Sequence, residues 1–95
     1  MANSDNHIIQ SAMLLKSIGH PIRVSIIIAL GENSIMTVTQ LSNYLSIDQP
    51  VMSLHLAILR KQHIIRVKKD GKQSFYSIED ITIKQIVNLV YHTRK

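Results

Sequence analysis

The sequence predicts a mainly α-helical fold with one small β-hairpin, a winged helix-turn-helix in the order α-α-β-α-α-β-β-α. Three observations lead to this prediction. Apolar residues recur at helical spacing through most of the chain. Two short helical segments near the middle are separated by a tight turn at residues 46–47. Beyond residue 63 the apolar pattern changes to a two-residue period around Asp70-Gly71, which is a strong hairpin signal.

The first two helices are predicted over residues 6–18 and 21–30. Gly19 suits the C-terminal cap of the first helix, and Pro21 suits the first position of the second. Gly31 is expected to end the second helix in the same way as Gly19 ends the first. The two helices should therefore be distinct and meet at a sharp bend.

The next segment carries the helix pair. Residues 34–36 could form an isolated bridging strand, and Thr37 with Gln40 three residues later predicts a capping box. This box opens a short helix that ends near residue 45. Asp48 is expected to cap another helix that runs to about residue 62. The face of that helix expected in the core carries Met52, Leu56 and Leu59.

The final segment is predicted to hold the hairpin and a last helix. Residues 64–69 and 72–78 are the expected strands, joined at Asp70-Gly71. Glu79 and Asp80 precede a helix whose apolar residues follow i, i+3, i+4, i+7 spacing. This stripe consists of Ile83, Ile86, Val87 and Val90.

Length and composition limit the classes of protein that fit. The chain has 95 residues, so one domain spanning 1–95 is expected. It contains no cysteine, which excludes disulfides and thiolate metal sites and fits a reducing cytoplasm. The N-terminus lacks the basic start and apolar run of a signal peptide. We therefore expect a cytoplasmic protein.

The distribution of charge indicates an anionic partner. The net charge is +5. Residues 1–49 hold two basic and three acidic residues, whereas residues 50–95 hold nine basic and three acidic ones. Nucleic acid is the usual partner of such a basic half, and an anionic membrane is the competitor. The last helix carries only Lys84 within it, so a membrane-binding basic helix fits poorly.

No pattern typical of an enzyme stands out. The chain lacks a nucleophile–base pair, a glycine-rich phosphate loop and a carboxylate pair at useful spacing. Its acidic residues fall at predicted helix caps and turns. The sequence therefore favours a binding protein over a catalyst.

Three segments carry a resemblance to a known family. They are residues 15–23 (LKSIGHPIR), residues 45–60 (LSIDQPVMSLHLAILR) and residues 70–78 (DGKQSFYSI). In this order and spacing they resemble the ArsR/SmtB family of bacterial repressors over roughly residues 12–92. The resemblance implies a homodimer that binds double-stranded DNA.

The chain departs from that family at its metal-sensing positions. The start of the third helix, residues 36–40, has no cysteine. Asp80 matches one ligand position near the last helix, but Thr82 stands where the family has histidine. One carboxylate without imidazoles does not make a zinc site. We therefore expect no metal and no cofactor, and the effector is left open.

The first part of the second helix of the pair should enter the major groove. Gln49 can contact a phosphate or an adenine edge, or can simply begin the helix. Ser53 can bind phosphate or a base edge. Val51 and Leu54 can touch thymine methyl groups, although Leu54 could instead pack against the third helix. For His55 the choices are phosphate contact, internal hydrogen bond or metal ligand, and the resemblance favours phosphate.

The hairpin tip is the second predicted DNA contact. Lys68, Lys69 and Lys72 surround Asp70-Gly71. Basic hairpins in this architecture flank the duplex and contact its backbone or minor groove. The alternative is an ordinary solvated turn.

A homodimer is expected because the first and last helices are both amphipathic and the domain is small. In the resembled family these helices form the interface; the alternative is that their apolar stripes pack within one chain. A two-fold dimer would place its recognition helices about 34–36 Å apart, matching an inverted repeat. The predicted interface residues are Ile8, Ile9, Met13, Ile83, Ile86, Val87 and Val90.

The function expected from the sequence is a sequence-specific DNA-binding transcriptional regulator. Repression is what the resemblance implies, and activation is not excluded. The competing hypothesis is a winged-helix protein-interaction module that does not bind DNA. Charge reversal at Lys68, Lys69 and Lys72 would separate the two, because an interaction module should keep its partner.

Overall fold

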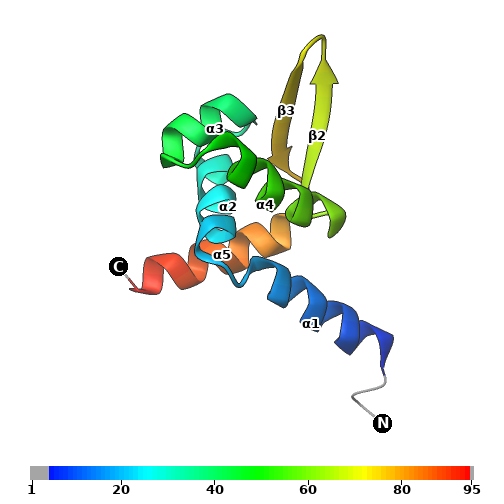
Figure 1. Cartoon of the computed structure of the whole chain (residues 1–95). Coiled ribbons are helices and arrows are strands. Elements are labelled where there is room, and N and C mark those ends of the chain that lie inside the picture. Colours follow the sequence, from blue (N-terminus) through cyan, green and yellow to red (C-terminus); the bar gives the residue numbers. More distant parts are fainter. Residues whose placement is uncertain (1–4, 95) are drawn as a thin grey trace.

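The computed structural model describes residues 5–94 as five helices and a three-stranded antiparallel sheet (Figure 1). The order of elements confirms the predicted winged helix-turn-helix. The elements are α1 (Asn6–Ile18), α2 (Pro21–Asn33), β1 (Met36–Thr37), α3 (Val38–Leu45), α4 (Gln49–Lys61), β2 (Ile65–Asp70), β3 (Gln73–Ile78) and α5 (Ile81–Arg94).

The bend between α1 and α2 has a local cause in the sequence. Gly19 caps the C-terminus of α1, and its N–H donates to the carbonyl of Lys16. His20 then caps α2, with its Nδ1 accepting from the N–H of Ile22 at 3.1 Å. Because Pro21 needs no hydrogen-bond partner for its nitrogen, it opens α2 without cost. α1 and α2 consequently diverge by 89°.

The prediction that Gly31 ends α2 is wrong. The helix continues to Asn33 and is capped by Ser34, which adopts a positive φ of 67°. A Cβ added at Gly31 would lie 3.4 Å from Cε of Lys84 on α5. Gly31 thus lies inside α2 where this helix packs beside Lys84 of α5, and an added Cβ would meet that side chain at about ordinary contact distance.

The helix pair forms as predicted. The Gln40 N–H donates to Oγ1 of Thr37 at 3.1 Å, and the Thr37 N–H donates to Oε1 of Gln40 at 2.9 Å, completing the capping box. Asp48 is the N-cap residue of α4, but its side chain makes no capping hydrogen bond. Ser46, with a φ of 55°, makes the turn between the two helices.

The sheet has the strand order β1-β3-β2. Arg66 pairs with Ser77 and Lys68 with Phe75, and the strands end at Gly71, whose φ is +63°. This hairpin forms the wing. In Figure 1 it stands out from the helices with its tip pointing away from them.

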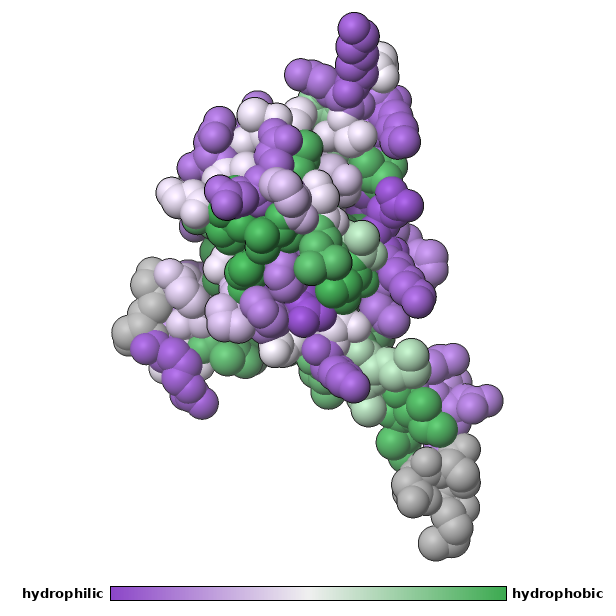
Figure 2. Space-filling view, viewed as in Figure 1, coloured by the Kyte–Doolittle hydropathy of each residue, from purple (hydrophilic) through white to green (hydrophobic). Residues whose placement is uncertain are grey.

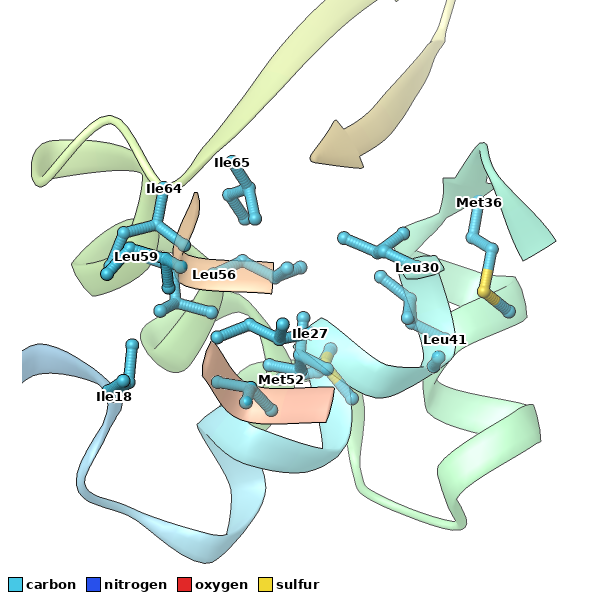
Figure 3. Close-up of a cluster of buried hydrophobic side chains, with 14 residues drawn as sticks. Ile18, Ile27, Leu30, Met36, Leu41, Met52, Leu56, Leu59, Ile64 and Ile65 are labelled. Carbon is cyan, nitrogen blue, oxygen red and sulfur yellow. The ribbon is translucent and has the colours of Figure 1, made fainter. Parts of the chain in front are cut away.

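The apolar core lies between α2, α3, α4 and the base of the wing (Figure 3). The prediction that one face of α4 is buried is confirmed, since Met52, Leu56 and Leu59 are at most 1% exposed. Ile64 and Ile65 anchor the start of the wing in the same core. This packing fixes α4 by one face and leaves its other face to solvent.

Candidate DNA-binding surface

The solvent face of α4 is unusually apolar for an exposed helix. Leu54 is 60% exposed and Val51 is 41% exposed, and Ser53 is exposed beside them. Figure 2 shows hydrophobic surface on the front of the body, bordered by hydrophilic side chains. Leu54 is thus a surface residue, which disagrees with the alternative that it packs against α3. An exposed patch of this kind on one helix face is a common mark of a binding surface.

Gln49 and Thr39 connect the beginnings of α4 and α3. The Gln49 amide donates from Nε2 to Oγ1 of Thr39 at 2.7 Å, and both residues are exposed. The hydrogen bond joins the first turns of the two helices at the surface. Sequence analysis missed Thr39, because a contact ten residues apart along the chain has no local signature.

His55 is not placed as predicted for a phosphate contact. Its side chain is buried, with 7% exposure, and its ring centroid lies 4.5 Å from that of His20. Nδ1 of His55 is buried without a hydrogen-bond partner among residues 5–94. Burial lowers the pKa of His55, and the neighbouring His20 and Arg23 lower it further. His55 is therefore not among the residues that we expect to contact DNA, because its side chain packs on the α2 side of α4.

The wing presents its lysines to solvent. Lys68, Lys69 and Lys72 are all exposed around the turn, and the tip of the wing is strongly hydrophilic in Figure 2. Arg66 and Lys68 lie on one face of the hairpin with Phe75, because alternate residues of a strand share a face. The wing therefore extends the positive charge beyond the body of the protein.

The residues predicted for the dimer interface divide into two groups. Ile83 and Val87 are only 4% exposed and belong to the core of the chain itself. The prediction that these two lie at the interface is wrong, because α5 turns them toward α2. The other members are exposed or lie at the surface boundary: Ile8, Ile9, Met13, Ile86 and Val90.

The exposed face of α5 also includes a residue that sequence analysis missed. Leu89 is 67% exposed, more than any other large apolar side chain in residues 5–94. Leu89 lies three residues after Ile86 and therefore on the same side of the helix. It falls next to the predicted i, i+3, i+4, i+7 stripe, which passes through Val90 instead. The exposed apolar face of α5 is thus wider than predicted.

Two other features of the described residues bear on function. No group of three or more His, Cys, Asp or Glu side chains in residues 5–94 is placed to hold a metal ion. No single helix there has the length and apolar character to cross a membrane, and the sharply bent pair α1 and α2 meets that test only jointly.

The fold and the exposed helix of the helix pair define the class of protein, a winged-helix regulator. The bacterial regulatory protein family arsR matches residues 20–67. The chain is 38% identical to an uncharacterized HTH-type transcriptional regulator of Methanocaldococcus jannaschii, over 85% of this chain and 91% of the relative. The chain therefore belongs to the arsR family of transcriptional regulators, and not to a family of enzymes.

Repressors and an activator are among its relatives. It is 34% identical to the biofilm growth-associated repressor of Xylella fastidiosa, over 84% of this chain and 69% of that protein. The structure of the repressor BigR from Xylella fastidiosa superposes with a TM-score of 0.84 at 29% identity, covering 97% and 93% of the two chains. HlyU of Vibrio cholerae, named a transcriptional activator, gives a TM-score of 0.84 at 26% identity, covering 94% and 96%.

Proposed function

We propose that this protein is a homodimeric transcriptional repressor that binds an inverted-repeat operator through α4 and the wing. The observation that carries the proposal is the exposed face of α4, which is fixed on the core behind it and presents small polar and apolar side chains to solvent. A helix held in this way can enter the major groove as a rigid reading element. The lysines of the wing supply the charge for the flanking phosphates.

The chemistry of the α4 face favours particular base contacts. Val51 and Leu54 can contact only apolar groups, and the thymine methyl is the apolar group in the major groove. Ser53 can donate to a phosphate or a base edge. Gln49 keeps its amide oxygen for DNA while its Nε2 bonds to Thr39. We therefore expect thymine at the centre of each half-site.

The dimer follows from two surfaces that the chain leaves uncovered. In Figure 1, α1 projects from the body, and the chain extends 48 Å along its longest axis. Ile8, Ile9 and Met13 on α1 are exposed, as are Leu89 and Val90 on α5. A two-fold partner would cover these residues and give each dimer two α4 helices for successive major grooves.

Repression is the direction we propose, because an operator-bound dimer can block polymerase without a further contact. Relatives named as repressors support this, although one relative is named as an activator. Because chromosomal DNA is the proposed partner, we propose that the protein acts in the cytoplasm. The chain as a whole would then act as one winged-helix unit in which α1 and α5 provide dimerisation.

The test is recovery of bound DNA. Purified protein is mixed with sheared DNA from its own source at near-physiological salt, and the retained fragments are sequenced. We expect a few enriched fragments that share an inverted repeat with half-site centres about 10 base pairs apart or a multiple of it. Leu54→Asp is the matched comparison, because it places a negative charge on the exposed face of α4 without touching the core. This variant should fail to enrich the same fragments. Retention of no fragments by the unaltered protein would favour a protein-interaction module instead.

A further inference from the structure

We infer that the junction of α1, α2 and α4 contains a binding site for a small oxyanion, separate from the α4 face and the wing tip. The site is a hollow of about 280 Å³ lined by residues of α1 and α2 and by Gln62, the C-cap residue of α4. This volume lies below the range of pockets for drug-sized ligands, which start at roughly 300 Å³. The hollow leaves room for an ion of the size of sulfate or phosphate together with several water molecules. The lining residues are Met13, Lys16, Ser17, Arg23 and Gln62.

The charge of the lining is the first argument for an anion. Lys16 and Arg23 both contribute to the hollow, and its lining residues include no Asp or Glu. Neither cation forms an ion pair with a described residue. Two cations that share a hollow repel each other, and a bound anion would turn that repulsion into attraction.

The second argument is an unsatisfied donor. Nε of Arg23 is buried and has no hydrogen-bond partner among residues 5–94. A buried N–H without a partner is costly, and such groups in native proteins usually meet a water or a ligand. The planar fork of an arginine matches the oxygens of sulfate, phosphate or carboxylate. Gln62 adds an amide that can donate to the same ion.

The hollow lies where a bound anion could affect the direction of α1. α1 packs on α2 and α4, and its buried residues, Ser17 and Ile18, lie at its C-terminal end, whereas its N-terminal part projects with the exposed residues of the proposed dimer surface. An oxyanion between Lys16, Arg23 and Gln62 would connect this projecting helix to the end of the DNA-reading helix. Its binding would therefore fix the direction of α1 relative to α4.

The experiment is a titration of the full chain with inorganic sulfate, followed by NMR, with chloride at equal ionic strength for comparison. We expect saturable shifts at the amides of Ser17, Arg23 and Gln62 that chloride does not reproduce. Sulfate should also raise the pKa of His55, because it offsets the Arg23 charge that now lowers that pKa. An equal response to chloride, or one that never saturates, would overturn the site.

Substitutions locate the site. Arg23→Gln and Lys16→Gln should each weaken sulfate binding about tenfold, the loss expected for one charged hydrogen bond. Lys16 is exposed, so Lys16→Gln decides the question if Arg23→Gln does not fold. Lys72→Gln removes the same charge at the wing tip and should leave sulfate binding unchanged. Unchanged binding in Arg23→Gln or Lys16→Gln would contradict the proposal.

DNA binding then identifies the source of the oxyanion. If a phosphate of the DNA backbone occupies the hollow, Arg23→Gln should reduce the slope of log affinity against log salt by about 0.9. If a free anion occupies the hollow, Arg23→Gln should have the same salt slope as the unaltered protein. Sulfate should then change the DNA affinity of the unaltered protein but not that of Arg23→Gln. Weaker DNA binding in Lys72→Gln with normal sulfate binding would keep this site distinct from the proposed operator-binding function.

Discussion

At the scale of single residues, His55 shows how burial changes the role of a side chain that the sequence places on the DNA-reading helix. The position of His55 three residues after Met52 and one before Leu56 puts it beside the buried face of α4. Its neighbours are His20 and Arg23 on α2. The surroundings of His55 come from a helix more than thirty residues earlier, and for this reason the sequence alone did not place it.

The first prediction concerns pH. The pKa of His55 in the folded chain lies below 6.5, its ordinary value, because of burial and the nearby His20 and Arg23. The unfolded chain therefore binds more protons than the folded chain between these two pKa values. The stability that neutral His55 contributes is complete above its ordinary pKa and is lost as the pH falls below it. Urea unfolding should show a lower free energy of unfolding at about pH 5.5 than at about pH 7.5.

Two variants attribute this effect to His55. His55→Gln should lose less stability than the unaltered protein over the same pH interval, because Gln does not titrate. His92→Gln removes an exposed histidine near the end of α5 and should keep the full dependence. Equal pH dependence in all three proteins would contradict the assignment.

The second prediction concerns the capping box of α3. Thr37→Ala removes the oxygen that accepts from the Gln40 N–H. It should lower the free energy of unfolding by about 1 kcal/mol, the usual value of an N-cap. Thr82→Ala at an exposed position of α5 should change it by less than about 0.5 kcal/mol. Chemical denaturation measures both, and a neutral Thr37→Ala would show that the cap does not hold α3.

At the scale of secondary-structure elements, sequence signals contained within a few residues predicted the helices and strands better than they predicted where each element ends. The capping box and the Gly19-Pro21 break are contained within a few residues, and each appears in the structure where it was expected. The hairpin turn was predicted at Asp70-Gly71 and lies one residue later, because Asp70 pairs with Gln73 and leaves Gly71 and Lys72 in the turn. The end of α2 was misplaced because Gly31 lies inside the helix, which continues to Asn33 and is capped by Ser34. The elements follow from local chemistry, whereas their exact limits depend on tertiary contacts.

The third prediction belongs to the wing as an element. Replacing Lys68, Lys69 and Lys72 together by Gln should make the loss of DNA affinity with salt shallower, by about 0.9 in slope for each phosphate contact removed. The preference for the operator over other DNA should remain, because α4 is unchanged. Fluorescence anisotropy at several salt concentrations measures both quantities.

Lys84→Gln is the matched control for the wing. Lys84 packs on α2 and lies on α5, away from the hairpin. Its replacement should leave the salt slope unchanged. A triple wing variant with the slope of the unaltered protein would mean that the wing does not touch DNA.

At the scale of the whole molecule, the same apolar stripe serves two purposes. Ile83 and Val87 fill the core, while Ile86, Leu89 and Val90 face outward from the same helix. Helical spacing predicts that α5 has apolar residues, but it cannot tell which of them meet the chain's own core. That division depends on how α5 crosses α2, and it decides which residues are available to a partner.

The last prediction tests the dimer and its link to DNA binding. Val90→Asp places a carboxylate on the exposed part of α5, where a partner would have to bury it without a counter-charge. An unpaired buried charge costs roughly 3 kcal/mol or more, so the dimer should dissociate at least about a hundredfold more readily. Sedimentation should show a folded monomer, and operator affinity should fall because one α4 helix cannot hold two half-sites.

Leu54→Asp makes the same chemical change at a residue of similar exposure on α4. It should sediment as the unaltered dimer and still fail to bind the operator, because the carboxylate faces the DNA. The two variants thus separate assembly from recognition. If Val90→Asp stays dimeric, the partner does not cover the outer face of α5; if Leu54→Asp binds the operator normally, α4 does not enter the groove.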